Sequence, residues 1–271
     1  MLKKIIFGIA LVLFTASFGI TADSIVIKGS TTVLPITQAA LEAYMIKTNK
    51  GVQISLSGGG SGEGIKALID KTADIGNSSR EIKKEEIELA AAKGIKPVAH
   101  VVAYDALTPI VNPENKVKGL STDQLSLIYQ GKITNWKEVG GDDLRIVVIS
   151  RDSSSGTFES WDHFVMKKAK VTPKAQMLAS SGAVVTAVAQ NRYAISYVGM
   201  GYLNKNVKAL EVNGIAASAQ TALSGKYPFS RELYMYTNGE PQGEVARFIA
   251  FLKGEEGQKI VAKEGFVPVT K

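Results

Sequence analysis

The sequence contains no cysteine and only two histidines among its 271 residues. Without cysteine no disulfide can form, so the stability of the fold must come from packing. A lipid anchor attached through an N-terminal cysteine is excluded for the same reason. Two isolated histidines and no thiolate leave no transition-metal cluster visible. We therefore expect neither a metal site nor another cofactor.

A long apolar run opens the chain, in the segment "MLKKIIFGIALVLFTASFGITA". Lys3 and Lys4 precede the apolar stretch Ile5–Ile20, and a small-residue exit follows at Ala22, which is the pattern of a secretory signal peptide. A retained membrane anchor is the alternative, although the stretch is shorter than the roughly 20 residues that span a bilayer. We predict a signal peptide over residues 1–22, cleaved near Ala22, and a periplasmic protein.

The charge of the chain is only mildly positive, with 32 basic against 25 acidic residues and a formal net charge of +7. A nucleic-acid-binding protein gathers its lysines and arginines into a stripe, with aromatic residues that stack on bases. Here the lysines are spread over predicted helix faces such as "EIKKEEIELAAAKG". We therefore expect no nucleic acid as partner, whereas a positive field helps to draw small anions toward the protein.

Strands, loops and helices alternate along the chain, which predicts βαβ units and a mainly parallel sheet. In the first part, strands are expected over residues 24–28, 52–57 and 73–79, each followed by a helix. A second series begins with a helix capped by Ser121 and continues with strands over residues 144–150 and 193–198. Extended apolar segments over residues 95–111 and 231–238 are typical of crossings between two bodies, and two helices end the chain.

Four loops of small residues join a predicted strand to a predicted helix: "GSTTVLP", "GGGSGEGI", "NSSREI" and "SRDSSSGTF". The N-terminus of a helix has unpaired N–H groups and receives anions well. Small residues let an oxyanion approach the backbone, and hydroxyls can donate to its oxygens. Taken alone, each loop could be a flexible turn or a cap that serves its own helix. Together, and with the planar guanidinium of Arg151, they predict a site for a small tetrahedral oxyanion.

The motifs of nucleotide-binding proteins and hydrolases are incomplete. In "GGGSGEGIK" no serine or threonine follows Lys66, and the glycines fit no dinucleotide spacing. The window Gly59–Glu63 ends in the wrong residue for a nucleophile elbow. His163 follows Ser155 by two turns, but no acid is placed to orient it, and His100 is expected to be structural. We expect no catalytic residues and no enzyme.

These motifs, in this order, resemble the PstS family of periplasmic phosphate-binding proteins, the substrate-binding subunits of phosphate ABC transporters. The resemblance covers the whole chain after the signal peptide and includes the segments "SGGGSGEGIKAL", "ADIGNSSREI" and "IYQGKITNWKEVGG". It implies an α/β protein with a type II periplasmic-binding-protein fold: two Rossmann-like lobes joined by two crossing hinge strands. Lobe I would comprise residues 23–103 and 234–271, and lobe II residues 104–233.

The resemblance also implies which residues bind the anion. Thr32, the backbone of Val33 and Ser61 are expected to bind from lobe I. Arg151, Ser155, Gly156 and Thr157 are expected to bind from lobe II. The complete set of predicted phosphate-binding residues is Thr31, Thr32, Val33, Ser61, Gly62, Ser79, Arg80, Arg151, Ser155, Gly156 and Thr157.

One position departs from the pattern of many family members. They carry an aspartate where this chain has Ser79, and that carboxylate accepts the proton of hydrogen phosphate and repels fully ionised sulfate. A hydroxyl at Ser79 could accept the proton but imposes no charge penalty against sulfate. Phosphate remains the expected ligand, and sulfate, molybdate or another oxyanion is the alternative.

The expected function is high-affinity binding of inorganic phosphate and its delivery to an ABC transporter. The lobes would close over the anion and then dock on the permease subunits in the inner membrane, and a monomer is expected. Two alternatives stay open: a phosphatase that uses the same oxyanion site, and a phosphate sensor or surface protein on the same fold. A phosphatase would require a base or metal ligands, which the sequence does not offer.

Overall fold

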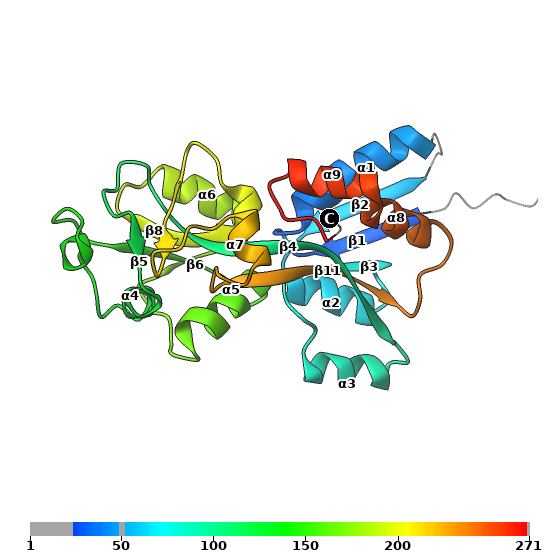
Figure 1. The fold of residues 1–271 in the computed structure, drawn as a ribbon. Coiled ribbons are helices and arrows are strands. Elements are labelled where there is room, and N and C mark those ends of the chain that lie inside the picture. The colour runs from blue at the N-terminus through cyan, green and yellow to red at the C-terminus, as the bar shows by residue number, and fades with distance from the viewer. Residues whose placement is uncertain (1–23, 49–51, 270–271) are drawn as a thin grey trace, which may run out of the picture.

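The computed structural model describes residues 24–48 and 52–269. The predicted signal peptide, residues 1–22, lies outside the described residues. Figure 1 shows two α/β parts side by side, connected by two long strands that run between them. Within the described ranges, no helix is both long and apolar enough to cross a membrane.

The first lobe, as we name the part that holds the N-terminal strands, has a small parallel sheet at its centre. Its strands are β1 (Ser24–Gly29), β2 (Gln53–Gly58) and β3 (Ile75–Ser78). β1 pairs in parallel with both β2 and β3. Ile25 and Ile27 of β1 are fully buried, as expected of β-branched residues in a central strand.

Helices cover both faces of this sheet (Figure 1). They are α1 (Leu34–Thr48), α2 (Ser61–Ile69), α3 (Lys84–Ala92), α8 (Gly243–Lys253) and α9 (Glu255–Lys263). α1, α8 and α9 share one hydrophobic core with β1, in which Phe248 and Val261 are fully buried. α2 and α3 pack on the opposite face around Ile65 and Leu68. The first lobe therefore has three layers, and its loops lie at the ends of the strands.

The second lobe contains the remaining elements. Its strands are β5 (Gly119–Leu120), β6 (Val147–Arg151), β7 (Gln176–Leu178), β8 (Ala194–Gly199), β9 (Lys208–Ala209) and β10 (Glu211–Val212). Its α-helices are α4 (Thr122–Tyr129), α5 (Gly156–Trp161), α6 (Ser181–Ala189) and α7 (Ala219–Leu223). β6 pairs in parallel with β7 and β8. Trp161 stacks on Tyr197 with ring centroids 4.2 Å apart, and both side chains are fully buried.

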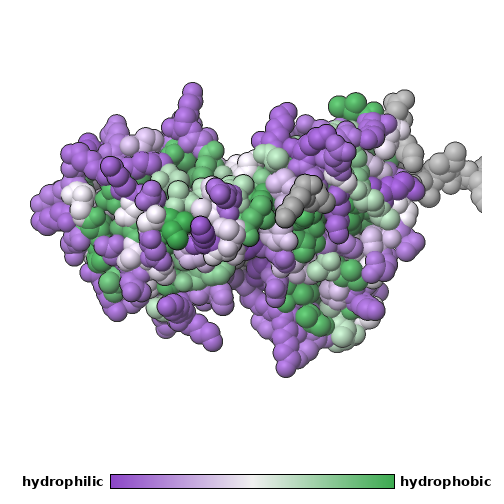
Figure 2. Space-filling view, viewed as in Figure 1, coloured by the Kyte–Doolittle hydropathy of each residue, from purple (hydrophilic) through white to green (hydrophobic). Residues whose placement is uncertain are grey.

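Two antiparallel strands connect the lobes: β4 (Pro97–Val111) and β11 (Ser230–Asn238). β11 lies between β3 and β4 in the sheet, and the far end of β4 pairs with β8 of the second lobe. A register shift interrupts the β4–β11 ladder at Leu233 and Tyr234. Figure 2 shows that the surface narrows to a waist between the lobes, with hydrophilic residues along its lower edge.

The architecture confirms the expected fold class of two α/β lobes with two crossing strands. The antiparallel pairing of β4 and β11 makes the sheet mixed, although the βαβ parts are parallel as expected. Ser121 caps α4 as expected, since its hydroxyl accepts a hydrogen bond from the amide of Gln124 at 3.0 Å. The exact lobe boundaries remain a prediction, as does cleavage near Ala22.

Candidate functional site

Six hydroxyl side chains from both lobes meet between the lobes, and each is at most 5% exposed. We name them the hydroxyl cluster: Thr31, Thr32, Ser61, Ser79, Thr157 and Ser181. Thr31 and Thr32 come from the loop before α1 and Ser79 from the loop after β3. The other three lie in the first turns of α2, α5 and α6. Five of the six are predicted site residues, so the structure brings most of the expected loops to one place.

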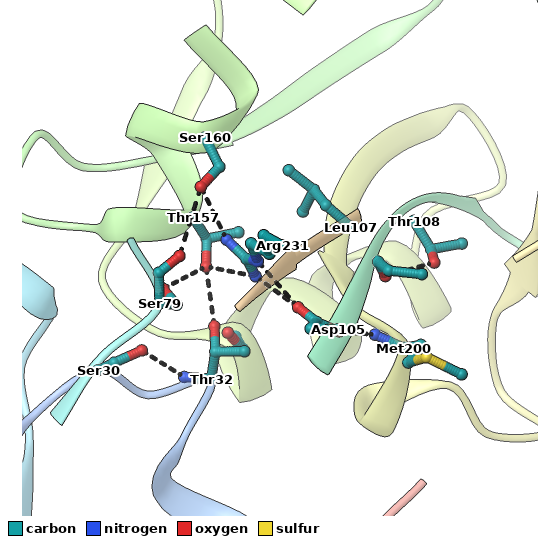
Figure 3. A network of polar contacts seen from close by, with 12 residues as sticks. Ser30, Thr32, Ser79, Asp105, Leu107, Thr108, Thr157, Ser160, Met200 and Arg231 are labelled. Atoms are coloured by element: carbon teal, nitrogen blue, oxygen red, sulfur yellow. Dashed lines mark hydrogen bonds and ion pairs between the residues drawn. The ribbon is translucent and has the colours of Figure 1, made fainter. Parts of the chain in front are cut away.

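The two lobes touch directly at Thr157, in the first turn of α5 (Figure 3). Its Oγ1 lies 2.8 Å from Thr32 Oγ1 and 3.4 Å from Ser79 Oγ. Ser61 Oγ accepts a hydrogen bond from the amide of Ser79 at 2.9 Å. Because a hydroxyl can donate one hydrogen and accept two, this arrangement can turn its donors toward a shared anion.

The second contact between lobes in the cluster joins Thr31 to Ser181. Their hydroxyl oxygens lie 3.3 Å apart, and the amide of Ser181 donates to Thr31 Oγ1 at 3.3 Å. Tyr202 of the second lobe donates its hydroxyl to the carbonyl of Thr31. Burial raises the pKa of Tyr202 to about 12, so its phenol stays a neutral donor near neutral pH.

Arg151 brings a positive charge to this end of the cluster. It is 1% exposed, and its guanidinium donates to Ser181 Oγ at 3.2 Å and to the carbonyls of Leu178 and Ala179 at 3.0 and 2.8 Å. Among the described residues, no carboxylate lies within ion-pair distance of it. Burial lowers the pKa of Arg151, because the interior disfavours an uncompensated charge. A bound oxyanion would supply the missing negative charge.

Glycine makes the close approach of the lobes possible at Gly156. A Cβ atom there would lie 2.2 Å from Ser61 Oγ and 2.9 Å from Ser79 Oγ. Both distances are shorter than the sum of the van der Waals radii of carbon and oxygen. No other residue fits this position in the observed arrangement. In the motif Ser155-Gly156-Thr157, the glycine is therefore needed because a side chain would not fit, in addition to the backbone amide that it offers.

Ser154 of the second lobe forms hydrogen bonds with the glycine-rich segment at the start of α2. The amide of Gly62 donates to the carbonyl of Ser154 at 3.0 Å, and Ser154 Oγ donates to the carbonyl of Gly59 at 3.0 Å. Gly60 has a φ of 115°, which favours glycine, and an added Cβ would lie 2.6 Å from Ser154 Oγ. Gly62 thus uses its amide for contact between the lobes.

Arg80 is the predicted residue that lies apart from the cluster. Its guanidinium forms a bidentate pair with Glu86 at 2.8 Å, and its Nε lies 2.8 Å from Glu159 of the second lobe. Lys83 also pairs with Glu159 at 2.8 Å. The structure therefore places Arg80 in a carboxylate network that joins the lobes, beside the site and without a hydroxyl of the cluster as partner.

Two further predicted residues have structural partners. Ser155 caps α5, since its Oγ accepts a hydrogen bond from the amide of Phe158 at 3.2 Å. Val33 is fully buried in the core of the first lobe, and its carbonyl accepts a hydrogen bond from the amide of Thr37 at 3.0 Å. Both residues stabilise the ends of loops next to members of the cluster. That they also bind the anion through their backbone amides stays a prediction.

Sequence reasoning missed an ion pair at the edge of the cluster. Arg231 on β11 pairs with Asp105 on β4 at 2.8 Å and donates to Thr157 Oγ1 at 3.2 Å (Figure 3). Both residues lie in the segments expected to cross between the lobes. A charged residue within an otherwise apolar strand is the sequence feature that could have indicated this ion pair. Ser181 was also missed, because β7, which precedes it, is only three residues long.

The two histidines lie away from the cluster. His100 on β4 lies 2.8 Å from Thr237 of β11, and burial and the charge of Lys253 lower its pKa. His163 lines a cavity of about 570 Å³ beside Arg80. Neither histidine contacts a member of the hydroxyl cluster, so the site offers hydroxyls and the guanidiniums of Arg151 and Arg231 but no imidazole base. Such a set of donors is suited to hold an oxyanion.

Comparisons with known proteins agree with this chemistry. The model of the PBP superfamily domain matches residues 16–256. The phosphate-binding proteins PstS of Borreliella burgdorferi and Bacillus subtilis are both 36% identical to the chain, over 90% and 92% of its length and 89% and 82% of theirs. A Clostridium perfringens protein, solved with bound phosphate and named as a phosphate ABC transporter substrate-binding protein, is 38% identical with a TM-score of 0.84. The match covers 92% of this chain and 100% of that one.

Proposed function

The chain belongs to the PstS phosphate-binding proteins of the PBP superfamily, and we therefore propose that it binds inorganic phosphate and delivers it to an ABC transporter. It would act outside the cytoplasmic membrane, in the periplasm, as a monomer that docks on the permease subunits. The named relatives are binding proteins, which supports a role without catalysis.

The observation that carries the proposal is the pairing of the hydroxyl cluster with a buried arginine that lacks a carboxylate among the described residues. Removing a multiply charged anion from water is costly unless many charge-assisted hydrogen bonds replace its hydration. The cluster supplies six hydroxyls from two lobes, and Arg151 supplies the charge. A micromolar dissociation constant corresponds to about −8 kcal/mol, which a closed site of this kind can supply.

The proposal includes closure of the lobes, because the hydroxyls of the cluster belong to both lobes. Thr32 lies on the first lobe and Thr157 on the second, and the contact between them requires that the lobes be together. Only β4 and β11 cross between the lobes in the described part of the chain, so opening would bend these two strands. Phosphate would enter while the lobes are apart and be enclosed when they meet.

The protonation state of the ligand determines selectivity. Hydrogen phosphate must donate its proton to an acceptor, and Ser79 offers a neutral hydroxyl there. Asp105, a carboxylate at the edge of the cluster, is occupied by Arg231 and by the amide of Met200. We therefore expect phosphate to bind with less discrimination against sulfate than a site with a carboxylate at position 79 would show.

The test is a comparison of melting temperatures with phosphate, sulfate, arsenate and molybdate, each against chloride at the same ionic strength. The protein is unfolded and refolded first, so that bound ligand is removed. Because a ligand of the native state raises the melting temperature, phosphate should give a clear increase at concentrations far above its Kd. No increase with phosphate, or a larger one with another oxyanion, would contradict the proposal.

The transport role needs its own measurement. Reconstituted permease and ATPase subunits should take up radioactive phosphate only when the purified protein is present on the periplasmic side. A protein that binds phosphate but leaves uptake unchanged would be a sensor and not a transporter subunit. Size-exclusion chromatography with light scattering would test the expected monomer.

A further inference from the structure

A buried ion pair lies where the crossing strands pass the hydroxyl cluster. Arg231 of β11 and Asp105 of β4 are opposite one another in the ladder. Asp105 Oδ2 accepts hydrogen bonds from Nε and Nη2 of Arg231 at 2.9 and 2.8 Å, and Oδ1 accepts one from the amide of Met200 at 2.9 Å. The two side chains are 5% and 0% exposed, so Asp105 is enclosed and the side chain of Arg231 nearly so.

The remaining donors of Arg231 reach two hydroxyls of α5 (Figure 3). Nη2 donates to Thr157 Oγ1 at 3.2 Å, and Nη1 donates to Ser160 Oγ at 3.2 Å. Ser160 in turn donates to the carbonyl of Ser79 on the first lobe at 3.4 Å. Arg231 thus organises two chains of hydrogen bonds, and both run from the crossing strands to the contact between the lobes.

The direction of these hydrogen bonds is fixed by chemistry. A guanidinium can only donate, so Thr157 Oγ1 accepts from Arg231 and must point its own hydrogen elsewhere. The other partners of Thr157 Oγ1 are Thr32 and Ser79, which are both in the cluster. An oxyanion bound there needs donors, and a hydroxyl polarised by a cation is a stronger one. Asp105 compensates the charge of Arg231, so the pair orients the donor without adding net charge.

We propose that Arg231, held by Asp105, is a positioning residue for anion binding: it fixes the hydroxyl of Thr157 as a donor toward the cluster without itself contacting the anion. The inference rests on the proposed function, since it assigns a role within the same site. It also explains why an almost completely buried ion pair lies on the strands that join the lobes. Replacing Arg231 should therefore weaken phosphate binding only while position 157 carries a hydroxyl.

The experiment is a double-mutant cycle on the full protein, with phosphate affinity measured by calorimetry. The four proteins are the parent, Arg231→Lys, Thr157→Val and the double variant. Lysine keeps the charge beside Asp105 but cannot reach both hydroxyls as the planar fork does. We expect Arg231→Lys to weaken binding about tenfold in the parent and less than about twofold in the Thr157→Val background. In a Thr157→Ser background, which restores the hydroxyl, the tenfold effect should return.

Controls separate this role from a purely structural one. Arg247→Lys, in an ion pair with Glu244 on α8, should leave phosphate affinity unchanged. If Arg231→Lys does not fold, as judged by circular dichroism, the neutral pair Asp105→Asn with Arg231→Gln takes its place in the cycle, because it leaves no lone buried charge. An equal loss in both backgrounds, or no loss in the parent, would overturn the inference while leaving the proposed function intact. A parent protein that does not bind phosphate would overturn both.

Discussion

The loop after β3 and the loop after β6 look alike in sequence but use their arginines differently. Both combine serines with one arginine: Arg80 in the first lobe, whose side chain is 9% exposed, and the buried Arg151 in the second. Burial acts to lower the pKa of Arg80, but the hydrogen bonds and charges of Glu86 and Glu159 outweigh it and raise this pKa above its ordinary value. Burial lowers the pKa of Arg151, which has only carbonyl and hydroxyl partners.

An arginine in a loop of small residues therefore does not by itself mark an anion site. What matters is whether carboxylates already compensate its charge. Arg80 is compensated twice and connects the lobes, whereas Arg151 keeps a charge that a ligand can satisfy. Four substitutions test this distinction between the two loops, and each is expected to have a smaller effect than the one before it.

Arg151→Ala should cause the largest loss. A buried anion would lose its charged partner, which costs about 3 to 5 kcal/mol, or at least a hundredfold in Kd. Calorimetry with phosphate measures the effect, and the matched variant Arg80→Ala should lose far less. Equal losses at the two arginines would remove the distinction between the loops.

Gly156→Ala should weaken phosphate binding by about tenfold to a hundredfold, because overpacking costs about 1 to 3 kcal/mol. The added Cβ would meet Ser61 across the contact and hold the lobes apart. Gly182→Ala on α6 is the control, since a Cβ there has no atom within 4 Å. Small-angle X-ray scattering with saturating phosphate should show a more open form for the first variant alone. If the two variants bind phosphate equally, the close approach at Gly156 does not matter for binding.

Ser79→Asp should change selectivity rather than affinity for phosphate. The new carboxylate can accept the proton of hydrogen phosphate but repels sulfate, so the ratio of the two affinities should rise about tenfold. Competition calorimetry at neutral pH measures this ratio. Ser79→Ala, which removes the hydroxyl without adding charge, should lower both affinities together. An unchanged ratio in Ser79→Asp would place this position outside the reach of the anion.

Glu159→Gln should have the smallest effect. It removes the partner that Arg80 and Lys83 share across the lobes, and partly exposed pairs contribute about 0.2 to 1 kcal/mol. Phosphate affinity should fall by about two- to fivefold at low salt, and the difference should shrink in high salt, where such pairs are screened. Glu255→Gln, in an exposed pair on α9, should have no effect on affinity. A loss as large as that of Arg151→Ala would mean that the carboxylate network dominates closure.

Much of the fold could be predicted because the residue pattern indicates where strands end and helices begin. β-branched runs such as that of β1 end at small residues, and helices begin directly after them. The two-residue strands β5, β9 and β10 escaped prediction, since no periodic pattern can develop over such a length. α7 was missed for a similar reason, because five residues make little more than one turn.

The sequence predicts those site residues that local composition marks. It does not predict those whose contacts depend on how distant segments of the chain pair. The hydroxyls of Thr32, Ser61 and Thr157 lie in or directly after small-residue segments whose composition predicts them. The ion pair of Arg231 with Asp105 depends on the register of two antiparallel strands that are distant in sequence, which no local pattern encodes. The compensation of Arg80 by Glu159 depends in the same way on how the lobes meet.

The position of β11 between β3 and β4 determines when the first lobe can be completed. The ribosome makes residues 230–238 only after the entire second lobe, yet these residues fill the gap in the middle of the sheet. Until they arrive, β3 and β4 each keep an open edge that can pair with other chains. The topology therefore postpones folding of the N-terminal half until nearly all of the polypeptide has been synthesised.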